Sequence, residues 1–209
     1  MLISDIYAKL GIPPNLQQHM LRVTSVALFI AKNWQGTPLN TELLKTMLLL
    51  HDIGNIVRFD FEKHPEFLED EIIRIDFWKK RQKDFISKYG NDDHEATVAI
   101  LKELGVSEEI KQKIYQMGYW NVEKVKNSND WYLKLALYSD LRVGPFGILP
   151  LQKRVDDIHA RIEQYKNHLE FIGIAQELEN QIQANLEISV SKINNNSIIV
   201  NENLLKHIV

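Results

Sequence analysis

Residues 43–52 read LLKTMLLLHD, an apolar run that ends in His51 and Asp52. The pattern predicts a helix that begins at Thr41, with Asn40 as a competing cap, and runs to the histidine–aspartate pair. A buried carboxylate is costly unless it is paired or coordinated. An imidazole and a carboxylate side by side can bind one metal ion, so the pair predicts a ligand site. A chain with 7 histidines can contain this dipeptide by chance, so the prediction depends on further ligands elsewhere.

Helical patterns extend to both sides of this stretch. Apolar residues recur at spacings of three and four between Pro14 and Trp34, which is typical of an amphipathic helix that begins near a proline. Further helices are expected over about residues 66–88, 93–104, 130–143 and 151–185, with another that begins after Ser107. The glycines and proline of residues 144–147 predict a turn. The sequence therefore predicts an all-α fold.

The chain is expected to form one helical domain over residues 1–185 and a C-terminal tail over residues 186–209. In the tail, two short apolar runs flank the asparagines of residues 194–196, and a β-hairpin is one interpretation. The alternative, which we favour, is an extended tail with a short helical turn at residues 202–207.

The composition narrows the function classes. A content of 44% hydrophobic and 25% charged residues is ordinary for a soluble globular protein, and no apolar run approaches a membrane span. The first five residues lack the basic start of a secretory signal. The absence of cysteine removes disulfides and thiolate chemistry and fits a cytoplasmic protein. A net charge of -3 gives no strong sign of nucleic-acid binding.

Three further residues are candidate ligands. His19 borders the apolar stripe of its helix, where a histidine held by backbone hydrogen bonds is the simpler interpretation. Asp140 lies on the apolar face of its predicted helix, so it should be paired, protonated or metal-bound, and a salt bridge to Arg142 is the structural alternative. His94 opens a helix, where it either faces a site or is exposed. The remaining histidines are expected at the surface, namely His64, His159, His168 and His207.

His19, His51, Asp52 and Asp140 together supply two neutral imidazoles and two carboxylates from three predicted helices. Such ligands suit a divalent ion, namely Mn, Fe, Co, Ni, Zn or Mg, with open positions for water. A bound divalent ion lowers the pKa of its water and polarises a phosphoryl oxygen. These are the requirements of phosphoester hydrolysis.

The order of these residues resembles the HD-domain superfamily of metal-dependent phosphohydrolases. The segments that carry the likeness are HMLRV at 19–23, LLLHDIG at 48–54 and YSDLRV at 138–143, and the likeness covers roughly residues 10–165. It implies an orthogonal helix bundle in which the metal ligands are His19, His51, Asp52 and Asp140. It also implies that Asp52 orients the attacking water.

Some members of this superfamily carry two more histidines and bind a second metal ion. The segment that begins Asp93-His94 is similar to the first, but residues 116–120 contain no histidine where the second is expected. Some members also place a lysine or glutamate three residues after the HD aspartate, where this chain has Asn55. We therefore name His94, with Asp52, as the candidate catalytic residues.

Three arginines are candidates to bind the substrate phosphate, because a guanidinium offers bidentate contact to phosphate. Arg22 lies one turn from His19, Arg58 follows the HD turn, and Arg142 lies two residues past Asp140. A structural ion pair is the alternative for each of them.

Three functions compete. The first is a metal-dependent phosphohydrolase that acts on a nucleotide or another small phosphoester. The second is a non-catalytic regulatory protein that binds metal and nucleotide without turnover, an alternative that rests on the incomplete set of extra ligands. The third is an interaction scaffold built on the final helix and tail. A small phosphorylated substrate is the expected partner, a membrane is not, and a homodimer is left open.

Overall fold

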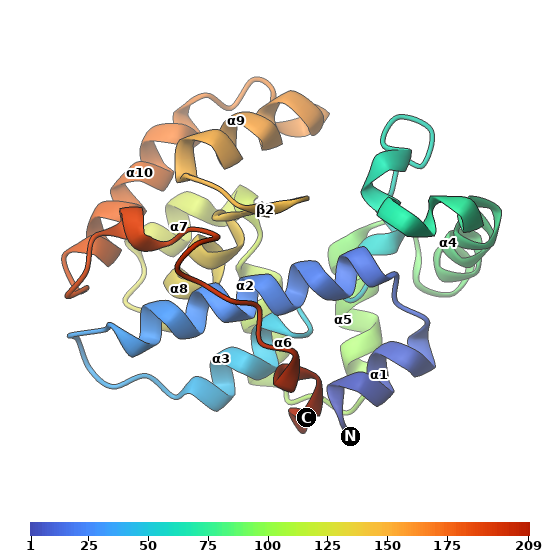
Figure 1. The fold of residues 1–209 in the computed structure, drawn as a ribbon, viewed down its shortest axis with the longest axis horizontal. Helices are drawn as coiled ribbons and strands as arrows, with labels where there is room; N and C mark the ends of the chain where they lie inside the picture. The colour runs from blue at the N-terminus through green and yellow to red at the C-terminus, as the bar shows by residue number, and fades with distance from the viewer. The chain divides into compact units, whose positions relative to one another are not determined.

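The computed structural model describes residues 1–209 and is dominated by helices (Figure 1). The only paired strands are β1 (Val143–Gly144) and β2 (Gly147–Ile148), which form a two-stranded antiparallel hairpin. The predicted all-α class is therefore confirmed. The chain divides into two compact units: unit 1 contains residues 1–21, 46–115 and 202–209, and unit 2 contains residues 22–45 and 116–201.

Unit 1 is built on the helices that surround the histidine–aspartate turn. Asp92 begins one of these helices by accepting hydrogen bonds from the backbone N–H groups of His94 and Glu95. Helix α2 begins in unit 1 and helix α3 ends there. The helices of the unit are α1 (Ile3–Leu10), α2 (Pro14–Lys32), α3 (Thr41–Leu48), η1 (Asn55–Arg58), η2 (Pro65–Arg74), α4 (Ile75–Tyr89), α5 (Asp93–Glu103), α6 (Glu108–Gln116) and η6 (Glu202–Lys206).

The two ends of the chain pair with each other in unit 1 (Figure 1). The terminal ammonium of Met1 donates to the carbonyl of Val209 at 2.8 Å, and the N–H of Ile3 donates to the carbonyl of His207 at 3.0 Å. The short helical turn predicted at residues 202–207 is present as η6, and residues 188–200 form no β-hairpin. The final residues are therefore integrated into a packed unit.

Unit 2 holds the second half of α2, the start of α3 and the helices between α6 and η6. Asp130 begins α8 by accepting from the N–H groups of Tyr132 and Leu133. Helix α10 contacts α7, α8 and α9. The helices are η3 (Tyr119–Asn121), α7 (Val122–Asn127), α8 (Trp131–Asp140), α9 (Leu151–Arg161), η4 (Glu163–Tyr165), α10 (Glu170–Gln183) and η5 (Val190–Lys192).

Helix α3 ends earlier than its sequence predicts. It stops at Leu48, so the histidine–aspartate pair lies in a turn that leads into η1. Leu49 and Leu50 are fully buried, and an unbroken apolar run carries no periodicity that marks where a helix ends. The buried hydroxyl of Tyr7 on α1 donates to the carbonyl of Leu49 at 2.6 Å and so supports the non-helical backbone.

The prediction of one helix over residues 151–185 is wrong. The chain turns extended at Ile162 after α9, passes through η4 and resumes as α10 at Glu170. The interruption places the ring of Tyr165 edge-on against Tyr119, with 5.0 Å between centroids. Burying this aromatic side chain outweighs the local helical preference of the segment. The stretch predicted as a helix over residues 66–88 is likewise two helices, η2 and α4.

None of the helices combines the length and the apolar composition that crossing a membrane requires.

Candidate metal centre

The turn after α3 fixes the orientation of His51. Its Nδ1 lies 2.8 Å from the carbonyl oxygen of Leu48, and because a carbonyl only accepts, Nδ1 is the protonated nitrogen. In the neutral ring the lone pair then belongs to Nε2. Only 3% of the side chain is exposed. A histidine whose second nitrogen donates to a backbone carbonyl is oriented as metal-ligating histidines are.

His19 and Asp52 meet this nitrogen within unit 1. The Nε2 of His19 lies 3.4 Å from Oδ2 of Asp52, and the Nε2 of His51 lies 3.7 Å from the same oxygen. The two imidazole rings are 5.4 Å apart between centroids. The side chains of His19 and Asp52 are 16% and 21% exposed, so the group is reached by solvent. Two imidazole nitrogens and one carboxylate oxygen thus converge on one partly open place, as the sequence predicts.

Asn55 holds the aspartate of this group in place. Its Nδ2 donates to Oδ2 of Asp52 at 3.0 Å, which is the oxygen nearest to both histidines. A side-chain amide gains and loses no proton in the ordinary pH range, so this contact orients the carboxylate without proton transfer. Hydrogen bonds of this kind to a ligating carboxylate are a regular part of metal sites.

Gly54 lets α5 approach the turn closely. A Cβ at this position would lie 2.5 Å from the backbone nitrogen of Thr97 and 2.8 Å from its hydroxyl oxygen. The N–H of Gly54 donates to that hydroxyl at 3.1 Å. His94 precedes Thr97 by three residues on α5, and residues at this spacing share one side of a helix. The glycine therefore brings the His94 side of α5 against the turn.

A buried carboxylate, Asp93, links two of the predicted site residues. Its Oδ1 accepts from Nη1 of Arg58 at 3.1 Å, and its Oδ2 lies 3.6 Å from Nε2 of His94. Asp93 is not among the site residues that the sequence predicts. Its place next to a histidine at a helix start was the available signal. Arg58 keeps 39% of its side chain exposed, so part of its guanidinium faces solvent.

The predicted site residues of unit 2 lie on α2, at the end of α8 and in the turn that follows α8. Asp140 is the last residue of α8 and is half-buried. Arg22 lies on α2, also half-buried, three residues after His19. Arg142 is 3% exposed, and each of its three guanidinium nitrogens donates to an oxygen of the protein. These contacts favour the structural alternative for Arg142 over contact with a substrate phosphate.

The prediction that His159 lies at the surface is wrong. The side chain is buried at 8% exposure, and its Nε2 lies 3.1 Å from the hydroxyl of Tyr119. Burial raises the pKa of Tyr119 above its ordinary value, so the hydroxyl stays protonated and donates to the ring. Burial also lowers the pKa of His159. His159 is thus a neutral core histidine.

The fold and this group of residues define a helical protein with a histidine–aspartate centre of the kind that binds divalent metal ions. Comparison with family models gives a match to the HD domain over residues 16–164. The chain belongs to the HD-domain family, as its sequence order predicts. Neither the curated proteins nor the solved structures gave a match.

Proposed function

We propose that this protein is a metal-dependent phosphohydrolase that acts on a nucleotide or another small phosphoester through a metal-activated water. The observation that carries the proposal is the convergence of the Nε2 atoms of His19 and His51 on one oxygen of Asp52. HD domains are generally metal-dependent hydrolases, and membership of the family supports the reaction class.

The ligand set that we propose is His19, His51, Asp52 and Asp140. His19, His51 and Asp52 converge in unit 1, and Asp140 joins the set because the order of these residues along the chain matches the HD-domain family. The chemistry of the donors fits such an ion, since the backbone bond to Nδ1 of His51 reserves Nε2 for a ligand. Nitrogen and oxygen ligands suit Mn, Fe, Co, Ni, Zn or Mg. A divalent ion bound here would lower the pKa of a water and polarise a phosphoryl oxygen.

The side chains around this set have distinct proposed roles. Asp52, held by Asn55, orients the attacking water. His94 transfers a proton, and the Asp93 carboxylate lies beside its ring, with Oδ2 3.6 Å from Nε2 of His94. The exposed part of Arg58, together with Arg22, binds the phosphate of the substrate. Arg142 has no part in this contact, because its nitrogens already donate to the protein.

A phosphate-release screen tests the proposal. The purified protein is assayed on a panel of nucleotides, phosphomonoesters and phosphodiesters with each of several divalent ions. We expect metal-dependent release that is lost in Asp52→Ala and kept in His64→Ala, because the ring of His64 interacts with Glu66 and Phe67 near the surface. A metal-loaded protein that is inert on the whole panel contradicts the proposed reaction.

Asn55 favours a second function, a regulatory protein that binds metal and nucleotide without turnover. An amide stands where some members of the family place a lysine or glutamate, and it cannot transfer a proton. This alternative predicts that a nucleotide with metal raises the melting temperature while no product forms. Tight binding accompanied by hydrolysis contradicts the alternative.

The expected partner is a small phosphorylated molecule, most simply a nucleotide. The net charge of -3 offers no general attraction to nucleic acid. A cytoplasmic location and a homodimer stay predictions, and gel filtration with light scattering tests the second of them.

A further inference from the structure

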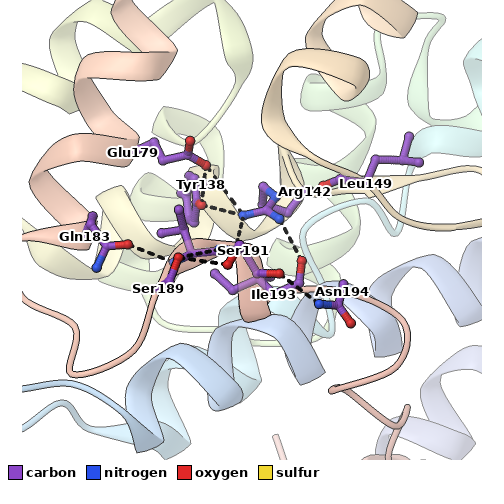
Figure 2. A network of polar contacts seen from close by, with 10 residues as sticks. Tyr138, Arg142, Leu149, Glu179, Gln183, Ser189, Ser191, Ile193 and Asn194 are labelled. Atoms are coloured by element: carbon purple, nitrogen blue, oxygen red, sulfur yellow. Dashed lines mark hydrogen bonds and ion pairs between the residues drawn. The ribbon is translucent and has the colours of Figure 1, made fainter.

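Arg142 lies at the centre of a polar network in unit 2 (Figure 2). Its Nε donates to the carbonyl of Leu149 at 2.7 Å, and its Nη2 donates to the carbonyl of Ile193 at 2.7 Å. Its Nη1 donates to the hydroxyl of Tyr138 at 2.6 Å and, more weakly, to the carbonyl of Val190 at 3.4 Å. A single buried side chain therefore joins the end of α8 and the hairpin that follows it to a stretch about 50 residues further along the chain.

The first of these stretches is the β-hairpin directly after α8. The backbone N–H of Leu149 donates to the carbonyl of Arg142 at 2.8 Å, while the side chain of Arg142 donates back to Leu149. Arg142 and Leu149 thus close the open end of the hairpin, next to the pair formed by Val143 and Ile148. Arg142, two residues after the end of α8, is thereby held through both its main chain and its side chain.

The second stretch is residues 189–195, which we call the C-terminal strap. Besides the bonds to Arg142, the strap is joined to the hairpin by Asn195, whose Oδ1 accepts from the N–H of Ile148 at 2.8 Å and whose Nδ2 donates to the carbonyl of Ile148 at 3.2 Å. Ser189 and Gln183 fix its start: the N–H of Val190 donates to Oε1 of Gln183 at 2.8 Å (Figure 2). The strap is held along its whole length.

The third stretch is the end of α8 itself. Tyr138 accepts from Arg142 and donates to Oε2 of Glu179 on α10 at 2.6 Å, and Glu179 lies 3.5 Å from Arg142. This carboxylate offsets the charge of the buried guanidinium. Asp140 lies between Tyr138 and Arg142 in sequence, so residues on both sides of it are anchored.

We propose that Arg142 is a positioning residue that, with the C-terminal strap, fixes the end of α8 so that Asp140 is presented as a metal ligand. This inference rests on the proposed function, which makes Asp140 a ligand. It assigns a role in the metal centre to residues 189–195, a part of the chain that the matched HD region, residues 16–164, does not include. Arginine suits the role because its planar fork can serve several carbonyls at once, which a lysine ammonium on a flexible stem does less well.

Metal affinity measured apart from activity tests the inference. Isothermal titration with Mn²⁺ is carried out on the wild type, Arg142→Lys, Asn195→Ala and the control Lys192→Met. Lys192 is an exposed cation in the strap, and the control removes a positive charge there without touching the network. Far-UV circular dichroism at the titration temperature shows which variants are folded.

We expect Arg142→Lys to be folded and to bind Mn²⁺ roughly tenfold to a hundredfold more weakly, the range seen when groups that orient ligands are changed. Asn195→Ala should weaken binding by less than Arg142→Lys does, and Lys192→Met should leave it unchanged. Should Arg142→Lys fail to fold, Asn195→Ala still gives the test through the strap.

A merely structural role would lower the melting temperature and leave the Mn²⁺ affinity of the folded variants equal to that of the wild type. That result overturns the inference alone. A wild type that binds no divalent ion contradicts the proposed function itself, and the inference falls with it. The two failures are therefore distinguished by the wild-type titration.

Discussion

The histidine–aspartate turn of unit 1 and the Arg142 network of unit 2 are both buried polar groups beside residues that the sequence marks as ligands. They differ in what their polar atoms meet. Around Arg142 every guanidinium nitrogen donates to a carbonyl or hydroxyl of the protein, and the side chain is 4% exposed. Around Asp52 two imidazole nitrogens converge on one oxygen, and the aspartate is 21% exposed.

This difference separates a structural group from a site. If a ligand took over the donors of such a guanidinium, the protein oxygens that now accept from it would be left without a donor. Each buried acceptor without a donor carries a free-energy cost. Acceptors that face one another gain from a cation between them. The geometry of the partners, and not burial or nearness to a motif, tells which arginine or aspartate acts on a ligand.

The largest expected effect on this comparison is a change in the free energy of unfolding. Arg142→Met removes the donors to the carbonyl of Leu149 and to the buried carbonyl of Ile193, and we expect a loss of about 3–5 kcal/mol in the free energy of unfolding. Arg58→Met should cost less than about 1 kcal/mol, because its ion pair with Asp93 is partly exposed. Urea denaturation measures both. Similar losses in the two variants would mean that the two arginines do not differ as described.

A second pair of changes tests the packing of α5 on the turn. Gly54→Ala places a Cβ against the backbone of Thr97, and we expect a destabilisation of about 1–3 kcal/mol from overpacking. Gly173→Ala is the matched control in α10, where a Cβ meets nothing within 4 Å. There the change should stabilise by about 0.5–1 kcal/mol. Thermal or urea unfolding that ranks the two in the opposite order contradicts the close approach.

The smallest expected effect concerns His159, a buried imidazole that is not part of the proposed site. Burial lowers its pKa below the ordinary 6.5, so the unfolded state takes up a proton at a higher pH than the folded state does. Its contribution to stability is complete above about pH 6.5 and is lost as the pH falls through the lowered pKa. Unfolding measured between pH 7 and pH 5 should show a weaker pH dependence in His159→Phe than in the wild type. An unchanged slope would contradict a neutral buried His159.

Much of the fold follows from local signals in the sequence. The proline before α2 and the capping residues of α5, α6 and α8 lie where the pattern predicts helix starts, because capping chemistry is local. The end of α3 and the break between α9 and α10 were missed, since burial of Leu49 and Tyr165 depends on residues distant in sequence. Strands of two residues are too short to give a periodic signal.

The candidate site was likewise predictable from the sequence only in part. Spacing and residue type predicted that His19, His51 and Asp52 would lie together in one site, and their order along the chain resembled the family that the comparison then matched. The burial of Arg142 could not be read from the sequence, because its acceptors include carbonyls about 50 residues away. The same is true of His159, whose partner Tyr119 lies on a different element. The charge of a residue and of its sequence neighbours does not reveal whether its hydrogen-bonding groups have partners in the folded protein.

The measurement that tests the central claim most directly is the metal content of the purified protein, followed by titration with divalent ions. The wild type is compared with His51→Ala and Asp52→Asn, and with His64→Ala as the control near the surface. We expect about one ion per chain in the wild type and in the control, and little or none in the two centre variants. Full metal binding in folded His51→Ala would contradict a metal centre at the histidine–aspartate turn.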